Sequence, residues 1–189
     1  MRRAYQYKEA KKILDTILKK NPNHLASLNS LAYIEYKEGD LSSSQKILNR
    51  ILKSSCADKD KENEALAYLT LGAIDSKRTE QSWVFSKIKS AWQIKSYFEK
   101  AVTIAPHLAE THLSLGSFYL KAPSIVGGDL DQAIKELELS LTIAPDFGLT
   151  NARLAQAYRK KGDLVKYNLY LKRAKELDPA NEGLKEMNL

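Results

Sequence analysis

Residues 111–145 read THLSLGSFYLKAPSIVGGDLDQAIKELELSLTIAP, two segments with apolar residues at helical spacing on either side of a turn. Two glycines before the second segment suggest a phosphate-binding loop, but neither a Gly-Lys-Ser/Thr run nor a G-x-G-x-x-G run is present. Asp129 and Gln132 instead form a capping-box pattern, in which the carboxylate occupies the N–H groups at the helix start. The stretch therefore predicts a helix hairpin closed by a proline, not an anion site.

Prolines at comparable points close similar segments along the rest of the chain. They stand in NPNHL from residue 21, APHLA from 105, APDFG from 144 and DPANE from 178. Pro145 and Pro179 are 34 residues apart, and the same step from Pro22 ends at Cys56. The next steps, to Pro106 and to Pro145, are 50 and 39 residues long, so two repeats carry insertions. A repeat of this length indicates stacked structural units.

The repeats resemble the tetratricopeptide repeat family, which has W-x2-L-G-x2-Y in a first helix and A-x3-F in a second. First helices match at Leu28-x2-Leu31-Ala32, Tyr68-x2-Leu71-Gly72, His112-x2-Leu115-Gly116-x2-Tyr119 and Asn151-x2-Leu154-Ala155-x2-Tyr158. Second helices match at Ala10, Ser44, Ile94, Ala133 and Tyr167, and Gly39-Asp40, Gly128-Asp129 and Gly162-Asp163 precede three of them. Glu35 and Asp75 stand where the family prefers Tyr, and Ile94 and Tyr167 stand where it prefers Ala. The resemblance implies an all-α fold, a right-handed α-solenoid of stacked antiparallel helix hairpins with one concave groove.

The register of the repeats predicts one domain over residues 1–189. Its parts are 1–24, a partial repeat or cap; 25–58, a repeat; 65–108, a repeat with an insertion at about 78–92; 109–147, a repeat with an insertion at about 123–127; 148–181, a repeat; and 182–189, the start of a capping helix. Since the first repeat lacks its leading helix, we expect the chain to be part of a longer protein.

Small residues mark the points where the two helices of a hairpin should approach most closely. They are Ala32, Gly72, Gly116 and Ala155, and the preceding leucines 31, 71, 115 and 154 should fill the space between the helices. Glycine at the turn supplies backbone freedom, and aspartate caps the next helix.

The composition is that of a soluble globular protein, with 43% hydrophobic and 28% charged residues. No apolar run approaches the ~18 residues of a membrane span, and the first residues do not form an export signal. Thirty basic against 23 acidic residues give a net charge of +7, but the charges are interspersed and no recognition motif accompanies them. Nucleic acid is therefore disfavoured as a partner. The compartment is left open: cytoplasmic by default, periplasmic if a signal peptide precedes Met1.

Residues suited to catalysis or metal binding do not form a recognisable constellation. His107 and His112 are five residues apart with Glu110 between them, which is not the H-E-x-x-H spacing of zinc proteases. Cys56 is the single cysteine, and neither a paired histidine nor a helix start is indicated beside it. The sequence predicts a protein that is not an enzyme and has no catalytic residue, metal or cofactor.

In the resembling family the first helix of each hairpin lines the groove, so the helical period selects side chains for contact with a partner protein or peptide. The predicted groove residues are Asn29, Tyr33, Tyr36, Lys37, Lys77, Glu110, Ser117, Lys121, Gln156, Arg159 and Lys160. Lys37, Lys77, Lys121 and Lys160 hold equivalent places near helix ends. They form either a basic strip for an acidic partner or a set of lysines that suits the helix dipole. The Lys-x3-Asn clamp of relatives that bind chaperone tails is replaced by Asn29-x3-Tyr33.

The two insertions offer further surfaces. Aromatic residues of the first, Trp83, Phe85 and Trp92, form a secondary interface or fold back over the long loop at residues 56–64. The second, PSIVGGD, resembles an insertion in periplasmic helical-repeat proteins that assist solute transporters. An accessory role in solute transport, with residues 124–126 at the groove rim, is therefore an alternative to a protein-binding scaffold; a nucleic-acid-binding repeat is a more remote one.

Overall fold

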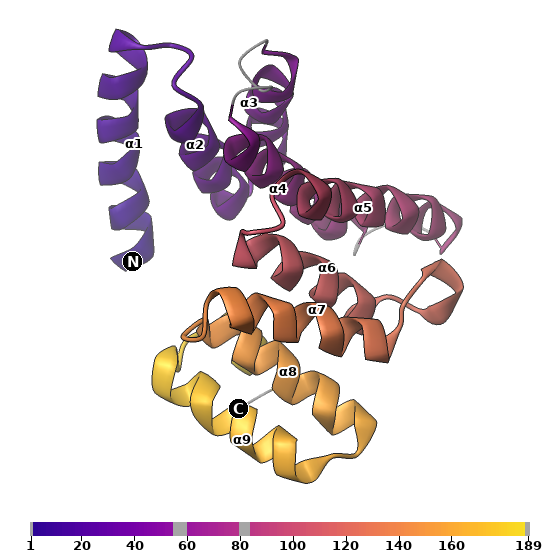
Figure 1. The fold of residues 1–189 in the computed structure, drawn as a ribbon. Coiled ribbons are helices and arrows are strands. Elements are labelled where there is room, and N and C mark those ends of the chain that lie inside the picture. Colours follow the sequence, from indigo (N-terminus) through magenta and orange to yellow (C-terminus); the bar gives the residue numbers. More distant parts are fainter. Residues whose placement is uncertain (1, 55–59, 80–83, 188–189) are drawn as a thin grey trace. The chain divides into compact units, whose positions relative to one another are not determined.

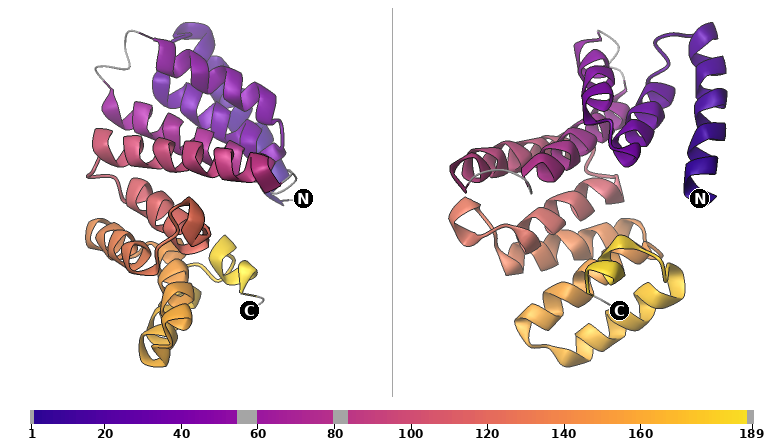
Figure 2. Two further views of the ribbon diagram at one scale, coloured as in Figure 1. Left: turned by 90° about the vertical axis from the view of Figure 1, so that its right-hand side faces the viewer. Right: turned by 180° about the vertical axis from the view of Figure 1, so that it is seen from behind.

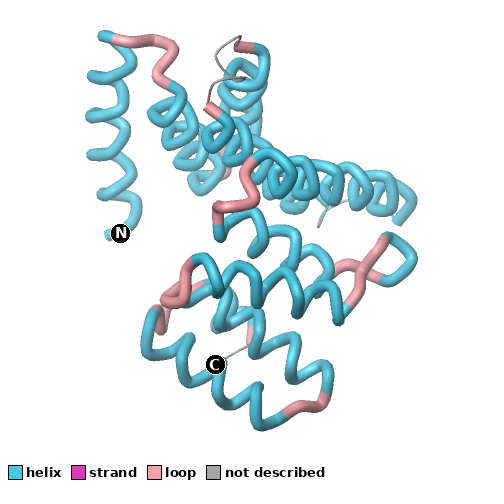
Figure 3. Tube along the Cα trace, viewed as in Figure 1, coloured by secondary structure: helices cyan, strands magenta, loops and turns pink. Residues whose placement is uncertain are grey.

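The computed structural model describes residues 2–54, 60–79 and 84–187 of the chain. Over these ranges the regular structure is helical, and Figure 3 shows helices joined by loops with no strand. The helices form two compact units, unit 1 (Met1–Ala105) and unit 2 (Pro106–Leu189). The predicted all-α class is confirmed. The prediction of a single domain stays a prediction beside this division.

The described residues of unit 1 form the helices α1 (Arg2–Lys20), α2 (Leu25–Glu38), α3 (Leu41–Lys53), α4 (Lys61–Thr79) and α5 (Val84–Ile104) (Figure 1). Each packs on the next in sequence, most extensively α2 with α3 and α4 with α5, and α2 also packs on α4. Leu48, Ile51 and Ile74 are fully buried at its core. The first helices of the two complete hairpins, α2 and α4, are thus neighbours.

Unit 2 also consists of paired helices in the described residues: α6 (Ala109–Lys121), the 3₁₀ turn η2 (Ser124–Val126), α7 (Leu130–Ile143), α8 (Gly148–Lys161), α9 (Leu164–Leu177) and α10 (Glu182–Glu186). α6 pairs with α7 and α8 with α9, while α6 and α10 both pack on α8 (Figure 2). Leu137 and Leu154 are fully buried in its core. α10 lies where the sequence predicts a capping helix, and its role as a cap stays a prediction.

The small residues lie where the helices of a hairpin approach each other. A Cβ atom at Gly72 would stand 2.3 Å from the Phe98 ring, and one at Gly116 would stand 2.8 Å from Leu137. Ala32 and Ala155 have no exposed surface. Glycine is required at the first two positions because the second helix leaves no room for a side chain. Of the four leucines before these residues, Leu31 is only half-buried.

Two of the three Gly-Asp turns have the predicted form. Gly39 and Gly162 end their helices in the left-handed conformation, with φ of 94° and 83°, and Asp40 and Asp163 cap the next helices. Prolines explain other helix ends: α7 stops at Ile143, two residues before Pro145, because a residue before proline disfavours the helical conformation.

The third turn differs, because the left-handed residue is Gly127, with φ of 92°. Gly128 is needed for space instead, since a Cβ there would lie 1.8 Å from the Ala122 carbonyl oxygen. Asp129 accepts from the Asp131 and Gln132 N–H groups at 2.9 and 3.0 Å. The Asp129 N–H donates to the Tyr119 carbonyl at 3.0 Å. In the predicted capping box this N–H would instead donate to the Gln132 side chain.

The long hairpin of unit 1 accounts for the first insertion. α4 and α5 contain 19 and 21 residues, whereas α2, α3, α6, α7, α8 and α9 contain 13 or 14. Within the described residues, the added length lies in both helices. Residues 80–83, including Trp83, lie outside the described residues, as do residues 55–59.

Candidate partner-binding surfaces

Aromatic and basic side chains gather on α2 and α4 of unit 1. The tyrosine rings of residues 33 and 36 have centroids 6.2 Å apart. The Lys37 ammonium lies 5.4 and 5.5 Å from these centroids, and the Lys77 ammonium lies 5.5 Å from that of Tyr36. Tyr33 is 47% exposed. We call these four residues the tyrosine–lysine surface.

Asn29, also predicted to line the groove, is buried between the two helices. Its Nδ2 donates to the backbone and side-chain oxygens of Asn63, both at 2.8 Å, and so ties α2 to the start of α4. Asn63 in turn donates from its backbone N–H to Asp60. Asn29 is only 8% exposed, so its contacts position α4 beside the tyrosine–lysine surface.

A different group of charges lies in unit 2, where α6, α8 and α10 come together. Both terminal nitrogens of Arg153 donate to the Glu186 carboxylate, Nη2 at 2.9 Å and Nη1 at a shorter distance. Lys121 Nζ donates to the same carboxylate at 2.8 Å. Gln156 accepts from Arg153 at 3.0 Å and donates to the Gly183 carbonyl at 2.9 Å. We call these four residues, Lys121, Arg153, Gln156 and Glu186, the carboxylate cluster.

The carboxylate cluster changes the ionisation of Glu186. Partial burial alone raises the pKa of this carboxyl, but the hydrogen bonds and charges of Arg153 and Lys121 outweigh it and lower the pKa to about 2. Arg153 is only 4% exposed. A guanidinium this deeply buried needs an anionic partner because desolvating an unpaired charge is costly.

The four equivalent lysines lie in the last turns of α2, α4, α6 and α8, as their spacing predicts. Their contacts are not equivalent. Lys37 and Lys77 lie over tyrosine rings, Lys121 binds Glu186, and Lys160 donates to the Leu120 carbonyl at 2.7 Å. Lys160 thus binds a carbonyl in the last turn of a different helix, α6, and both interpretations of the four lysines stay predictions.

The remaining predicted groove residues of unit 2 do not form a cluster. Glu110 is exposed in the first turn of α6, Ser117 is half-buried, and Arg159 is exposed near the end of α8. Sequence reasoning missed Arg153 and Glu186. Arg153 could have been found by its place between apolar residues of α8, since a charge on a buried face requires a partner.

The predicted secondary interface is described only in part. Trp92 is 50% exposed, with the Lys95 ammonium 5.7 Å from its ring. The side chains of Trp83 and Phe85 lie outside the described residues. The second insertion buries Val126 and leaves Ile125 74% exposed. Both roles assigned to the insertions stay predictions.

Residues considered for chemistry have structural contacts. His112 is buried, with Nδ1 2.7 Å from Glu136 Oε2 and Nε2 2.9 Å from the Pro106 carbonyl. His24 Nδ1 accepts from the Ser27 N–H at the start of α2. Cys56 lies outside the described residues. Across the described ranges, no group of three or more His, Cys, Asp and Glu side chains is placed to hold a metal ion, and no helix is both long and apolar enough to cross a membrane.

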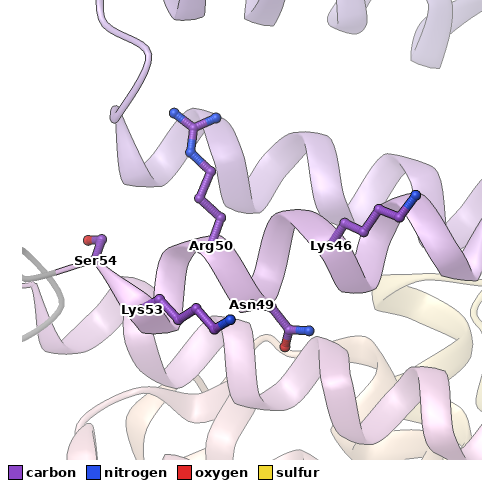
Figure 4. A pocket seen from close by; sticks show the side chains of 5 residues that line it. All are labelled: Lys46, Asn49, Arg50, Lys53 and Ser54. Carbon is purple, nitrogen blue, oxygen red and sulfur yellow. The ribbon is translucent and has the colours of Figure 1, made fainter.

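A shallow hollow lies on α3 of unit 1 (Figure 4). Lys46, Asn49, Arg50, Lys53 and Ser54 line it, all from this helix and its end. Arg50 donates to the Pro22 carbonyl at 2.6 Å and to Asn23 Oδ1 at 2.8 Å, so it fixes the turn before α2. Because polar groups from other elements do not converge on this hollow, it is not a ligand site of the usual kind.

Comparison with known proteins begins with the sequence. Residues 1–55 match a family model described as tetratricopeptide repeat, which covers α1, α2 and α3. No curated protein matches the chain.

Solved structures match over much more of the chain. TTC0263, a thermophilic TPR protein of Thermus thermophilus, is similar over 97% of this chain and 89% of its own, with 21% identity and a TM-score of 0.74. The fold is that of a tetratricopeptide-repeat protein. MamA of Desulfovibrio magneticus RS-1 is similar over 95% of this chain and 90% of its own, with 17% identity and a TM-score of 0.57. YrrB, a TPR protein described as having an unusual peptide-binding site, is similar over 100% and 87%, with 14% identity and a TM-score of 0.53.

Proposed function

We propose that the chain is a non-catalytic scaffold that binds an acidic segment of another protein along its first helices. Proteins with the tetratricopeptide-repeat fold generally mediate protein–protein interactions and are typically not enzymes. The description of YrrB as a peptide-binding member supports the same kind of partner for this chain. The predicted groove residues of both units, from Asn29 to Lys160, belong to this proposal.

The tyrosine–lysine surface carries the proposal. Tyr33 offers an exposed ring of the kind that anchors interfaces, at low cost in side-chain entropy. The ammonium groups of Lys37 and Lys77 lie over the rings and add positive charge to the same surface. An acidic segment with apolar side chains between its carboxylates suits both features, since the charges attract it and the rings bury its apolar groups.

A fluorescent 12-residue peptide in which glutamate alternates with leucine or alanine serves as the probe, and its glutamine counterpart serves as the uncharged control. We expect Tyr33→Ala to weaken binding of the glutamate probe about tenfold, because it removes the exposed anchor. Lys37→Glu and Lys77→Glu should each weaken binding about fivefold, since each reverses a surface charge. Fluorescence anisotropy at low ionic strength measures these affinities.

Lys53→Glu is the matched control, since it makes the same charge change on α3, away from the tyrosine–lysine surface. It should lower the affinity less than twofold. Equal weakening by Lys53→Glu and Lys37→Glu would show that the probe responds only to net charge. Equal affinity for the glutamate and glutamine probes would contradict an acidic partner.

A further inference from the structure

We propose that Arg153, Lys121 and Gln156 form a binding site for one carboxylate of a partner segment, and that Glu186 of α10 occupies this site as an internal competitor. The proposal names a specific site and a regulatory element within unit 2, and it rests on the proposed function as a protein-binding scaffold. Its evidence is separate from the tyrosine–lysine surface.

Arg153 has the geometry of a dedicated carboxylate receptor. Its two terminal nitrogens approach the two oxygens of Glu186, the paired arrangement that fits a planar carboxylate. Gln156 holds one of these nitrogens through its side-chain oxygen. The third guanidinium nitrogen, Nε, is buried and has no hydrogen-bond partner among the described residues. The arginine is thus oriented by α8 for an anion that another segment supplies.

The segment that supplies this anion, α10, is short. α10 has five residues, too few for a helix that is stable by itself. Leu184, 2% exposed, packs with Ala152 and Ala174, and Asn181 caps the helix by accepting from the Leu184 N–H at 3.0 Å. Short helices of this kind are among the first parts of a protein to open locally. When α10 opens, Arg153 and Lys121 lose their carboxylate and become available to another.

The contacts of α10 also define the chemistry of the partner. A Cβ at Gly183 would lie 2.6 Å from the Ala152 side chain, so the residue before the anchor must be very small. Leu184 fills the apolar site, and the carboxylate follows two residues later. The segment that best replaces α10 therefore contains Gly-Leu-x-Glu at the start of a helical turn.

The experiment uses the full chain and a labelled peptide with the sequence of residues 178–187, DPANEGLKEM. In the wild-type chain, attached α10 competes at high effective concentration and should leave the peptide weakly bound. Glu186→Gln removes the internal carboxylate, so we expect the peptide to bind this variant at least about tenfold more tightly. Amide exchange at Leu184 and Met187 should become about tenfold faster in the variant, because α10 opens more often.

Two controls isolate the carboxylate. Glu182→Gln changes the charge of the same helix at an exposed position in its first turn and should leave peptide affinity at the wild-type value. A peptide with glutamine at its last glutamate should not bind the Glu186→Gln chain. Adding Arg153→Met to Glu186→Gln should abolish binding of the original peptide. If circular dichroism shows that this double variant is unfolded, Lys121→Met, at a more exposed lysine, should still weaken binding about threefold.

The proposal is overturned if Glu186→Gln binds the peptide no more tightly than the wild-type chain, if the glutamine peptide binds equally well, or if α10 exchanges no faster. Each of these results would mean that Glu186 only holds α10 against α8. Such a failure is distinguishable from failure of the proposed function. The alternating glutamate probe would still bind in a manner that depends on Tyr33 and Lys37.

Discussion

The first helices of the two units carry positive charge in different ways. In unit 1 the Lys37 and Lys77 ammonium groups lie over tyrosine rings, and Tyr33 remains half-exposed. In unit 2 Lys121 and the buried Arg153 bind a carboxylate of the chain itself. The same repeat thus presents an aromatic surface in unit 1. In unit 2 it presents a basic site that is occupied by Glu186 of the same chain. The difference arises because α10 packs on α8 in unit 2.

The largest expected effect tests whether the turn that is peculiar to unit 2 holds that unit together. Gly128→Ala should lower the free energy of unfolding by about 3 kcal/mol, since its Cβ would collide with the Ala122 carbonyl oxygen. Gly162→Ala is the control: its positive φ is unfavourable for alanine, but nothing lies within 4 Å of its Cβ, so about 1 kcal/mol is expected. Chemical denaturation followed by circular dichroism measures both. Equal losses would show that the loop relaxes around the new side chain.

A second pair compares the same close approach in the two units. Gly72→Ala and Gly116→Ala should each cost about 2 kcal/mol, because Phe98 and Leu137 must move away from the new Cβ. Amide hydrogen exchange locates each effect, and we expect faster exchange in α4 and α5 for the first variant and in α6 and α7 for the second. Faster exchange throughout the chain in either variant would show instead that the two units unfold together.

The aspartate caps should give smaller and nearly equal losses. Asp40→Ala and Asp163→Ala each remove the acceptor for an N–H at a helix start, Ser43 in unit 1 and Lys166 in unit 2. A loss smaller than those of the glycine variants is expected for each, measured by urea denaturation. Replacement by asparagine, which is also a good cap, should restore most of the loss. A loss that asparagine does not restore would point to charge rather than capping.

The smallest effect is the pH dependence of α10. The pKa of Glu186 is lowered from its ordinary value of 4.5 to about 2, so its ion pairs stabilise the docked helix fully above pH 4.5 and are lost as the pH falls through 2. Because the side chain is 35% exposed, solvent screening reduces the contribution to stability. Carbon NMR of the Glu186 carboxyl and the Leu184 methyl signals should follow one low-pH transition. In the Glu186→Gln variant the Leu184 transition should be absent; its persistence would assign the change to another group.

Much of the fold could be predicted because its determinants are local. Gly39, Asp40, Gly162 and Asp163 act within one turn of their own positions, and prolines stop helices at the residues just before them. The candidate binding surfaces could be predicted less well from the sequence. The last-turn places of the four lysines followed from spacing, but their different contacts did not, and Asn29 was expected on a surface although it lies buried against Asn63.

The sequence by itself determined the repeat, the helix-forming segments and two of the three Gly-Asp turns, because backbone sterics and helical periodicity depend on near neighbours. The tertiary structure decided that Gly127, not Gly128, takes the left-handed conformation, since the Ala122 carbonyl fills the space beside Gly128. It also decided that Glu186 meets Arg153, 33 residues away. That pairing depends on where α10 packs. A long charged side chain could reach several partners, and the packing of α10 on α8 determines which one it meets.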